Sequence, residues 1–192
     1  RADQLIAYES FEKDIKDKKV KKFLDDIIFI RDEIIKLNEK PKLSDKELKK
    51  VEKLTPHLKI LTDQLNKIKI NLVINDPKLN IVKDIKLNSF ILRYQVIDGL
   101  LPKELRNIVD HGKKEIKEGV LIVFAIFENK VGIAVGITEK LTSKFDAVKL
   151  VKEAAEILGG KGGGGRKDFA QAGGLNKNKI EEAFDILSKK IN

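Results

Sequence analysis

The sequence contains no cysteine, methionine or tryptophan, and it has only two histidines and four prolines among 192 residues. The lack of cysteine excludes disulfides, thiolate chemistry and cysteine-ligated zinc sites, and it fits a cytoplasmic location. No run approaches the roughly 18 uninterrupted apolar residues of a membrane span, and no secretory signal is recognisable, so we expect no membrane partner. Because the chain starts at Arg1 and has no methionine, we expect a piece of a longer protein.

Charge is abundant, because 36% of the residues are Asp, Glu, Lys or Arg, compared with about 25% in an average globular protein. Lys and Arg outnumber Asp and Glu by 39 to 30, which gives a net charge of +9. This excess suits an anionic partner such as nucleic acid. The hydrophobic residues, 42% of the chain, recur periodically, which argues against a disordered chain.

In the first part of the chain, apolar residues alternate at spacings of three and four, which keeps one apolar seam facing a partner helix. The two seams are Val20, Phe23, Ile27, Ile30, Ile34 and Leu37, then Val51, Leu54, Leu58, Leu61, Leu65, Ile68 and Leu72. The segment 38–43 contains Pro41 and should end the first helix. Residues 1–78 are therefore predicted to form an antiparallel helical hairpin, a coiled coil.

Local signals refine this hairpin. Ser44 and Glu47 have the spacing of a capping box, which would start the second helix. Thr55-Pro56 should kink that helix or restart it with Thr55 as the N-cap. The turn residues 75–77 should end the region.

Residues 79–192 have a mixed pattern with the order β-α-β-β-α-loop-α. Strands are predicted at 89–97, 120–127 and 131–137. Helices are predicted to start at Pro102, to run from Ser143 to Leu158, and to start at Asn178. Asn178 and Glu181 would together cap the start of the last helix. The predicted fold class is α+β: a helical hairpin followed by a small α/β domain, with helices packed on a mostly antiparallel sheet and a glycine-rich loop.

The glycine-rich loop is the most informative segment, since eight of the 13 glycines lie within residues 159–174. A flexible linker is one explanation. A second is a loop whose backbone approaches a ligand closely, where any Cβ would clash and where N–H groups form a nest for a phosphate or carboxylate. Five cations and one anion lie between Lys161 and Lys179, so an anionic ligand is favoured.

No catalytic or metal motif is evident. The glycine run follows a predicted helix and lacks a following Gly-Lys-Ser/Thr, so it has the context of neither a dinucleotide fingerprint nor a Walker A loop. His57 and His111 have no metal-site or triad partner at recognisable spacing. We therefore expect no catalytic residue and no metal site in this chain.

The segment Gly162 to Gly174 reads Gly-Gly-Gly-Gly-Arg-Lys-Asp-Phe-Ala-Gln-Ala-Gly-Gly. It resembles a signature near the C-terminus of alanyl-tRNA synthetases. The order of elements from about residue 89 to the end is similar to that family's DHH-associated C-terminal domain. The family usually has proline where this chain has Lys167, and often methionine where it has Phe169; Lys167 removes a rigid φ and adds a charge.

The resemblance implies a non-catalytic C-terminal part of an alanine–tRNA ligase. Such a part would bind alanine tRNA at its outer corner, the elbow, and bring aminoacylation and editing to one tRNA. ATP, Mg²⁺ and Zn²⁺ would then serve centres elsewhere in the longer enzyme, with no cofactor in this chain. The residues expected to contact tRNA are Lys161, Gly162, Gly163, Gly164, Gly165, Arg166, Lys167, Gln171, Lys177 and Lys179.

Three alternatives stay open at this stage. The same domain type accompanies DHH phosphoesterases, where it would hold the substrate, although no Asp-His-His motif occurs in this sequence. The heptads could instead join two chains in a homodimer, as an oligomerisation module. Arg166 could also brace the loop by pairing with Asp168 rather than contact RNA.

Overall fold

The computed structural model describes residues 18–40 and 42–192. The chain divides into two compact units, residues 1–71 and 72–192, whereas the sequence placed the boundary after residue 78. The last turn of the second helix therefore belongs to the second unit. Each unit is described below by itself.

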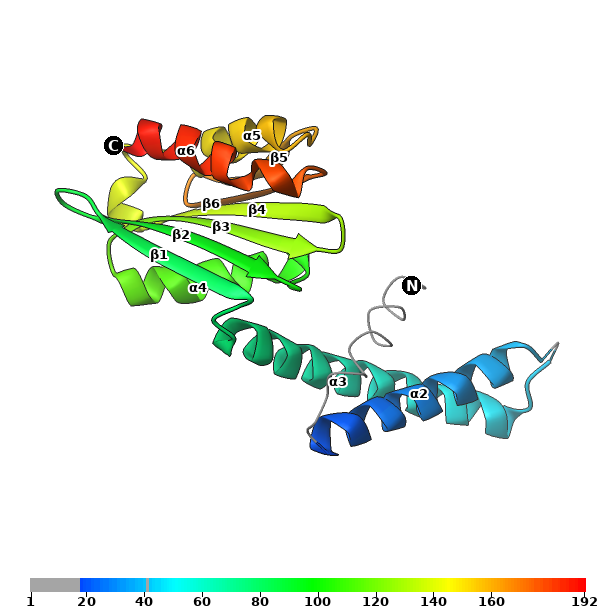
Figure 1. Cartoon of the computed structure of the whole chain (residues 1–192). Coiled ribbons are helices and arrows are strands. Elements are labelled where there is room, and N and C mark those ends of the chain that lie inside the picture. Colours follow the sequence, from blue (N-terminus) through cyan, green and yellow to red (C-terminus); the bar gives the residue numbers. More distant parts are fainter. Residues whose placement is uncertain (1–17, 41) are drawn as a thin grey trace. The chain divides into compact units, whose positions relative to one another are not determined.

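The first unit is a helical hairpin of α2 (Lys18–Asn38) and α3 (Asp45–Asn75), of which α3 continues into the second unit. Figure 1 shows the two helices running side by side in opposite directions after a short turn. Leu24, Ile27 and Ile30 of α2 pack against Leu61 and Leu65 of α3. The predicted hairpin is confirmed for α2 and α3, although Leu24 was missed. Residues 1–17 of the predicted range, Pro41 and the side chain of Val20 lie outside the described residues.

Of two local predictions in the hairpin, the restart of the second helix at Thr55 was wrong, and the capping-box bond from the Ser44 N–H to Glu47 is present. α3 runs through Pro56 without a break, and the Thr55 hydroxyl donates back to the Val51 carbonyl oxygen at 2.9 Å instead of capping a new helix. At the start of α3, Glu47 accepts from both the N–H and the hydroxyl of Ser44, at 2.9 and 2.8 Å. Glu47 also bonds Lys40, and these contacts lower the pKa of its carboxyl group to about 2.

The second unit contains a six-stranded sheet in the order β1-β2-β3-β4-β6-β5. The strands are β1 (Asn80–Lys86), β2 (Ile91–Asp98), β3 (Gly119–Phe127), β4 (Lys130–Ile137), β5 (Gly163–Arg166) and β6 (Phe169–Gly174). Only β2 and β3 pair in parallel, so the predicted mostly antiparallel sheet is confirmed. The sequence missed β1, β5 and β6.

Helices cover both faces of this sheet. Figure 1 shows α4 (Leu105–Ile116) on one face, and α5 (Ala147–Ile157) with α6 (Ile180–Ile191) on the other. The main core lies under α5 and α6, around the fully buried Phe124. Tyr94 packs edge-on against Phe124 and donates a 2.6 Å hydrogen bond from its hydroxyl group to Glu181 of α6.

The helix starts differ from the predicted ones. Asp146, not Ser143, caps α5 by accepting from the Val148 N–H at 2.9 Å. The short helix η2 (Glu139–Leu141) precedes that cap. Asn176, not Asn178, caps the short helix η3 (Lys177–Lys179) that leads into α6. A further short helix, η1 (Pro102–Glu104), starts the predicted helix at Pro102.

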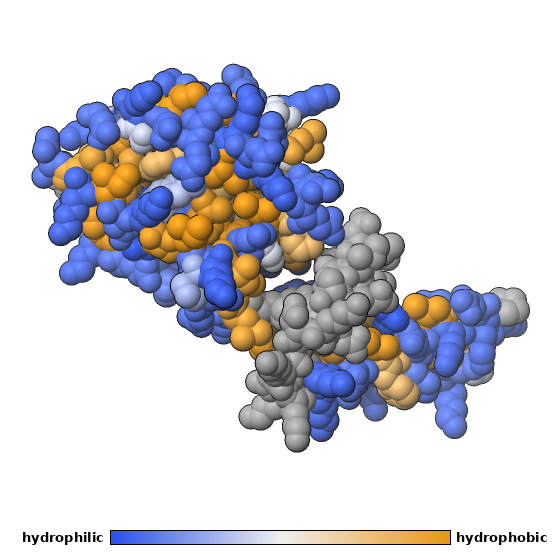
Figure 2. Space-filling model, in the orientation of Figure 1, coloured by the Kyte–Doolittle hydropathy of each residue, from blue (hydrophilic) through white to orange (hydrophobic). Residues whose placement is uncertain are grey.

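The edge strand β1 is mostly exposed, and Ile81, Val82 and Ile85 keep 46, 43 and 39% of their surface accessible. Figure 2 shows apolar surface between charged side chains on this side of the second unit. Because β1 lacks a buried face, its residues carry no alternating pattern, which explains why the sequence did not predict it.

Candidate nucleic-acid interface

The glycine-rich segment is a β-hairpin at the edge of the sheet, not a loop as predicted. β5 pairs with β6 antiparallel, with Gly164 opposite Gln171 and Arg166 opposite Phe169, and residues 167 and 168 form the turn. We call residues 163–174 the glycine ribbon. Because the backbone of β5 pairs with β6, it does not curl into the predicted phosphate nest.

Packing within the protein explains three of the ribbon glycines, and a Cβ on one of them, Gly174, would lie 2.5 Å from the Cβ of Leu158. A Cβ on Gly163 would lie 2.5 Å from the Cβ of Ala172 and 2.8 Å from Val151 of α5. A Cβ on Gly165 would lie 2.2 Å from the carbonyl oxygen of Phe169. Just before the ribbon, Gly162 has a φ of +114°, which only glycine adopts readily. These four glycines are therefore required by the fold itself.

Gly164 and Gly173 have no such explanation. A Cβ on either would meet no atom within 4 Å, and neither has a positive φ. Gly173 pairs with Gly132 of β4, whose missing Cβ faces η1 and α4. Gly164 pairs with Gln171, which lies two residues before Gly173 on β6, so Gly164 and Gly173 lie on the same side of the sheet. On this side of the sheet, the backbone at Gly164 and Gly173 has no side chain over it. We call this the bare side of the glycine ribbon.

A groove of about 300 Å³ runs along that bare side. Its lining residues are Lys103, Arg106, Gly164, Gly165, Arg166, Phe169 and Gln171. The Arg106 guanidinium lies 5.4 Å from the centre of the Phe169 ring, a cation–π distance. The groove thus combines three cations, a neutral amide and exposed glycine backbone, and no carboxylate lines it.

A second, larger cleft of about 660 Å³ adjoins the turn of the ribbon. It is lined by Lys113, Lys114, Ile137, Thr138, Glu139, Thr142, Arg166, Lys167 and Asp168. Arg166 lines both cavities. Together they form a track with six cations along one side of the ribbon.

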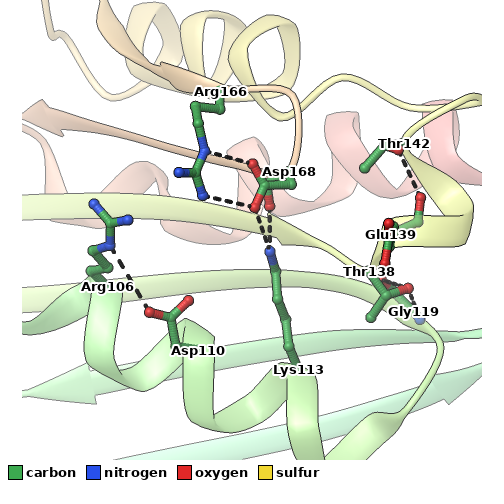
Figure 3. Close-up of polar contacts among 9 residues, drawn as sticks. All are labelled: Arg106, Asp110, Lys113, Gly119, Thr138, Glu139, Thr142, Arg166 and Asp168. Carbon is green, nitrogen blue, oxygen red and sulfur yellow. Dashed lines mark hydrogen bonds and ion pairs between the residues drawn. The ribbon is translucent and has the colours of Figure 1, made fainter.

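Asp168 lies between two of these cations, as Figure 3 shows. The Arg166 guanidinium donates to both carboxylate oxygens, at 2.9 and 3.1 Å. Lys113 Nζ donates to the Asp168 carbonyl oxygen at 2.6 Å and lies 3.4 Å from Oδ2. The bonds from Arg166 and, to a lesser extent, Lys113 hold the pKa of Asp168 below its ordinary value. The pairing of Arg166 with Asp168, one of the sequence alternatives, is therefore present.

The structure brings together only some of the predicted contact residues. Gly164, Gly165, Arg166 and Gln171 line the groove, and Lys167 lines the adjoining cleft. Lys161 lines a separate apolar depression. Lys177 and Lys179 lie in η3 and line none of these cavities; Lys179 Nζ lies 3.6 Å from Glu182.

Sequence reasoning missed Lys103, Arg106, Lys113 and Lys114 of η1 and α4. On a helix rich in charge, lysines and arginines are ordinarily read as a solvated face. Only the pairing of β6 with β4 sets these side chains beside the ribbon.

Within the described ranges, no group of three or more His, Cys, Asp or Glu side chains is placed to hold a metal ion. His111 lies 3.4 Å from Glu115, an exposed pair on one helix turn. No helix in the part of the chain that the structure describes has the length and apolar character needed to cross a membrane.

Comparison with known proteins decides the family. Residues 89–192 match the DHHA1 domain. The chain belongs to this family. It is 47% identical over 96 residues to an alanine–tRNA ligase of Parvibaculum lavamentivorans, and 46% identical over 101 residues to one of Hyphomonas neptunium. These matches cover 50 and 53% of this chain but only 11 and 12% of those proteins.

A solved structure shows the same relationship. The crystal structure of the C-Ala domain from Aquifex aeolicus alanyl-tRNA synthetase matches with a TM-score of 0.53 and 31% identity, covering 56% of this chain and 96% of that one. The chain is thus a DHHA1 protein related to the C-terminal region of alanyl-tRNA synthetases. The resemblance inferred from Gly162 to Gly174 is confirmed.

Proposed function

We propose that this DHHA1 chain binds tRNA, and that the bare side of the glycine ribbon contacts the RNA backbone. The observation that carries the proposal is Gly164, a glycine that neither its φ nor its packing requires, in a groove rimmed by Lys103, Arg106 and Arg166. A missing side chain beside three cations suits the close approach of a sugar-phosphate strand. Gln171 adds a neutral amide donor.

The relatives support tRNA over other polyanions, since those named above are alanine–tRNA ligases. They also favour this function over the substrate domain of a DHH phosphoesterase. Within the proposal, the chain contacts the outer corner of the tRNA and helps present one tRNA to aminoacylation and editing in a longer enzyme. A cytoplasmic location follows from that role.

The test is Gly164→Ala, measured with full-length alanine tRNA by fluorescence anisotropy. The added methyl group meets no protein atom, so the melting temperature should not fall. Binding should weaken roughly tenfold or more, the equivalent of losing one hydrogen bond to a charged group.

The matched control is Gly163→Ala on the opposite side of the same strand. Its methyl group would lie 2.5 Å from the Cβ of Ala172, so this variant should lose thermal stability. An unchanged affinity for Gly164→Ala would remove the ribbon from the interface.

We further propose that the helical hairpin associates with a second copy of the chain. Phe29 is 66% exposed, and Ile28 and Ile35, seven residues apart on the same helix, are 36 and 46% exposed. An apolar strip of this kind is favourable to bury, and salt does not screen that burial.

Sedimentation equilibrium should accordingly show a dimer that persists at high salt and that Phe29→Gln weakens. At about 100 μM, a dimer with a dissociation constant of about 10 μM would be mostly formed. A wild-type chain that stays monomeric at that concentration would overturn the dimer.

A further inference from the structure

Asp168 is the one carboxylate that Arg166 contacts in the track, and the pair is bidentate. A carboxylate in this arrangement presents two oxygens to the guanidinium fork, as a phosphate does. Asp168 therefore occupies the donor groups of Arg166 that a phosphate would otherwise bind, and it neutralises the charge of that cation.

The two cations around Asp168 differ in how firmly they are held. Arg166 is 68% exposed, whereas Lys113 is only 17% exposed. The Lys113 stem passes over Gly136, where a Cβ would lie 3.1 Å from Lys113 Cε. Lys113 also shares the Asp168 carbonyl oxygen with the N–H of Ile137. Since exposed ion pairs are weak, Arg166 is the partner that Asp168 can give up.

The path for Arg166 is open. Its side chain lines both the turn-side cleft and the ribbon groove. Because the side chain is 68% exposed and already borders the groove, an anion bound in the groove can compete with Asp168 for its guanidinium. Such an anion would also lie beside Lys103 and Arg106.

We propose that Asp168 is a specificity-determining residue. In the free protein it pairs with Arg166, and when RNA binds, Arg166 leaves Asp168 and pairs with an RNA phosphate, while Lys113 stays paired with the Asp168 carboxylate. This inference rests on the proposed function. An anion must outcompete an internal carboxylate to gain Arg166. A phosphate of a strand that also contacts Lys103 and Arg106 displaces Asp168 from Arg166, because the other two cations add to its binding. A single isolated anion lacks those contacts and does not displace Asp168. Asp168 thus lowers affinity for small or scattered anions and favours a continuous phosphate backbone.

The variant Asp168→Asn tests the exchange, because asparagine keeps the shape and removes the charge. With full-length alanine tRNA, binding should tighten roughly two- to fivefold, the range expected when a weak exposed ion pair no longer competes. In the Arg166→Gln background, the further change Asp168→Asn should give no tighter binding, because no guanidinium at position 166 remains to be released. Binding of inorganic pyrophosphate should gain at least as much as binding of tRNA.

Asp110→Asn is the matched control, because Asp110 lies on the same side of the sheet, with its carboxylate 3.9 Å from Arg106. It removes the same charge but releases only the looser 3.9 Å contact of Arg106 and leaves the Arg166 pair intact, so its gain should be smaller than that of Asp168→Asn. Equal gains would overturn the exchange and leave only a general charge effect.

Two other outcomes separate the inference from the proposed function. If Asp168→Asn keeps the wild-type melting temperature but binds tRNA no better or more weakly, while Arg166→Gln binds more weakly than wild type, Asp168 is a brace. The exchange is then wrong and tRNA binding stands. If all variants and the wild type bind tRNA alike at every salt concentration, Arg166 contacts no phosphate, and both the exchange and the ribbon interface are wrong.

Discussion

Replacing Lys103, Arg106 and Arg166 together by glutamine is expected to abolish most of the salt-dependent binding of tRNA. Each phosphate contact contributes about 0.7 to 0.9 to the slope of log affinity against log salt, so the slope should fall by about two. Because such charge effects vanish near 1 M salt, a slope change of about two corresponds to roughly 100-fold weaker binding at 0.1 M. Fluorescence anisotropy across a salt series measures both quantities.

The matched control removes three exposed lysines from the helices on the opposite face of the sheet, Lys149, Lys152 and Lys189. This triple variant has the same net charge as the groove variant. Its affinity for tRNA should fall only slightly, because these lysines attract the RNA only from a distance, and salt screens that attraction. If both triple variants weaken binding equally, net charge alone attracts the RNA and the groove has no special role.

Phe124→Ala is expected to cause the largest loss of stability. The side chain is fully buried in the centre of β3, packs edge-on against Tyr94 at 6.0 Å and lies opposite Ile133 of β4. Removing a buried phenylalanine leaves a cavity and costs about 3 to 5 kcal/mol. A small domain has about 5 to 15 kcal/mol of stability in total, so much of it would be lost. Urea unfolding followed by circular dichroism measures the change.

Leu175→Ala is the control in the same unit, because Leu175 is 70% exposed. Exposed substitutions usually change the free energy of unfolding by less than about 0.5 kcal/mol. A loss below about 1 kcal/mol for Phe124→Ala would contradict the core described around β3.

The glycine-rich segment shows how far sequence reasoning reached. Composition singled out residues 159–174, and the resemblance of the motif from Gly162 to Gly174 to a signature of alanyl-tRNA synthetases pointed to the family. The sequence offered two explanations, a flexible linker or close approach to a ligand, and each of them treated all the glycines alike. The structure separates the glycines: Gly163 and Gly165 avoid clashes within the protein, whereas Gly164 faces open space. A residue letter carries no information about which neighbour fills the space beside it.

The caps and the edge strands mark the same limit. Asp146 and Ser143 are both good N-caps by type, and only the start of α5 shows that Asp146 is used. Glycine has low β-propensity, so β5 read as a loop. It is a strand because pairing with β6 provides its hydrogen bonds.

The sequence by itself determined the helical hairpin, the strands β2, β3 and β4, the presence of helices near α4, α5 and α6, the basic character and, through the motif, the family. Periodicity, charge and motif are local properties of the chain and can be counted directly. Only the tertiary structure decided that Lys103, Arg106 and Lys113 of one helical region stand beside Arg166 and Asp168. That meeting depends on the order β4-β6-β5, which long-range pairing sets and which no spacing along the sequence encodes.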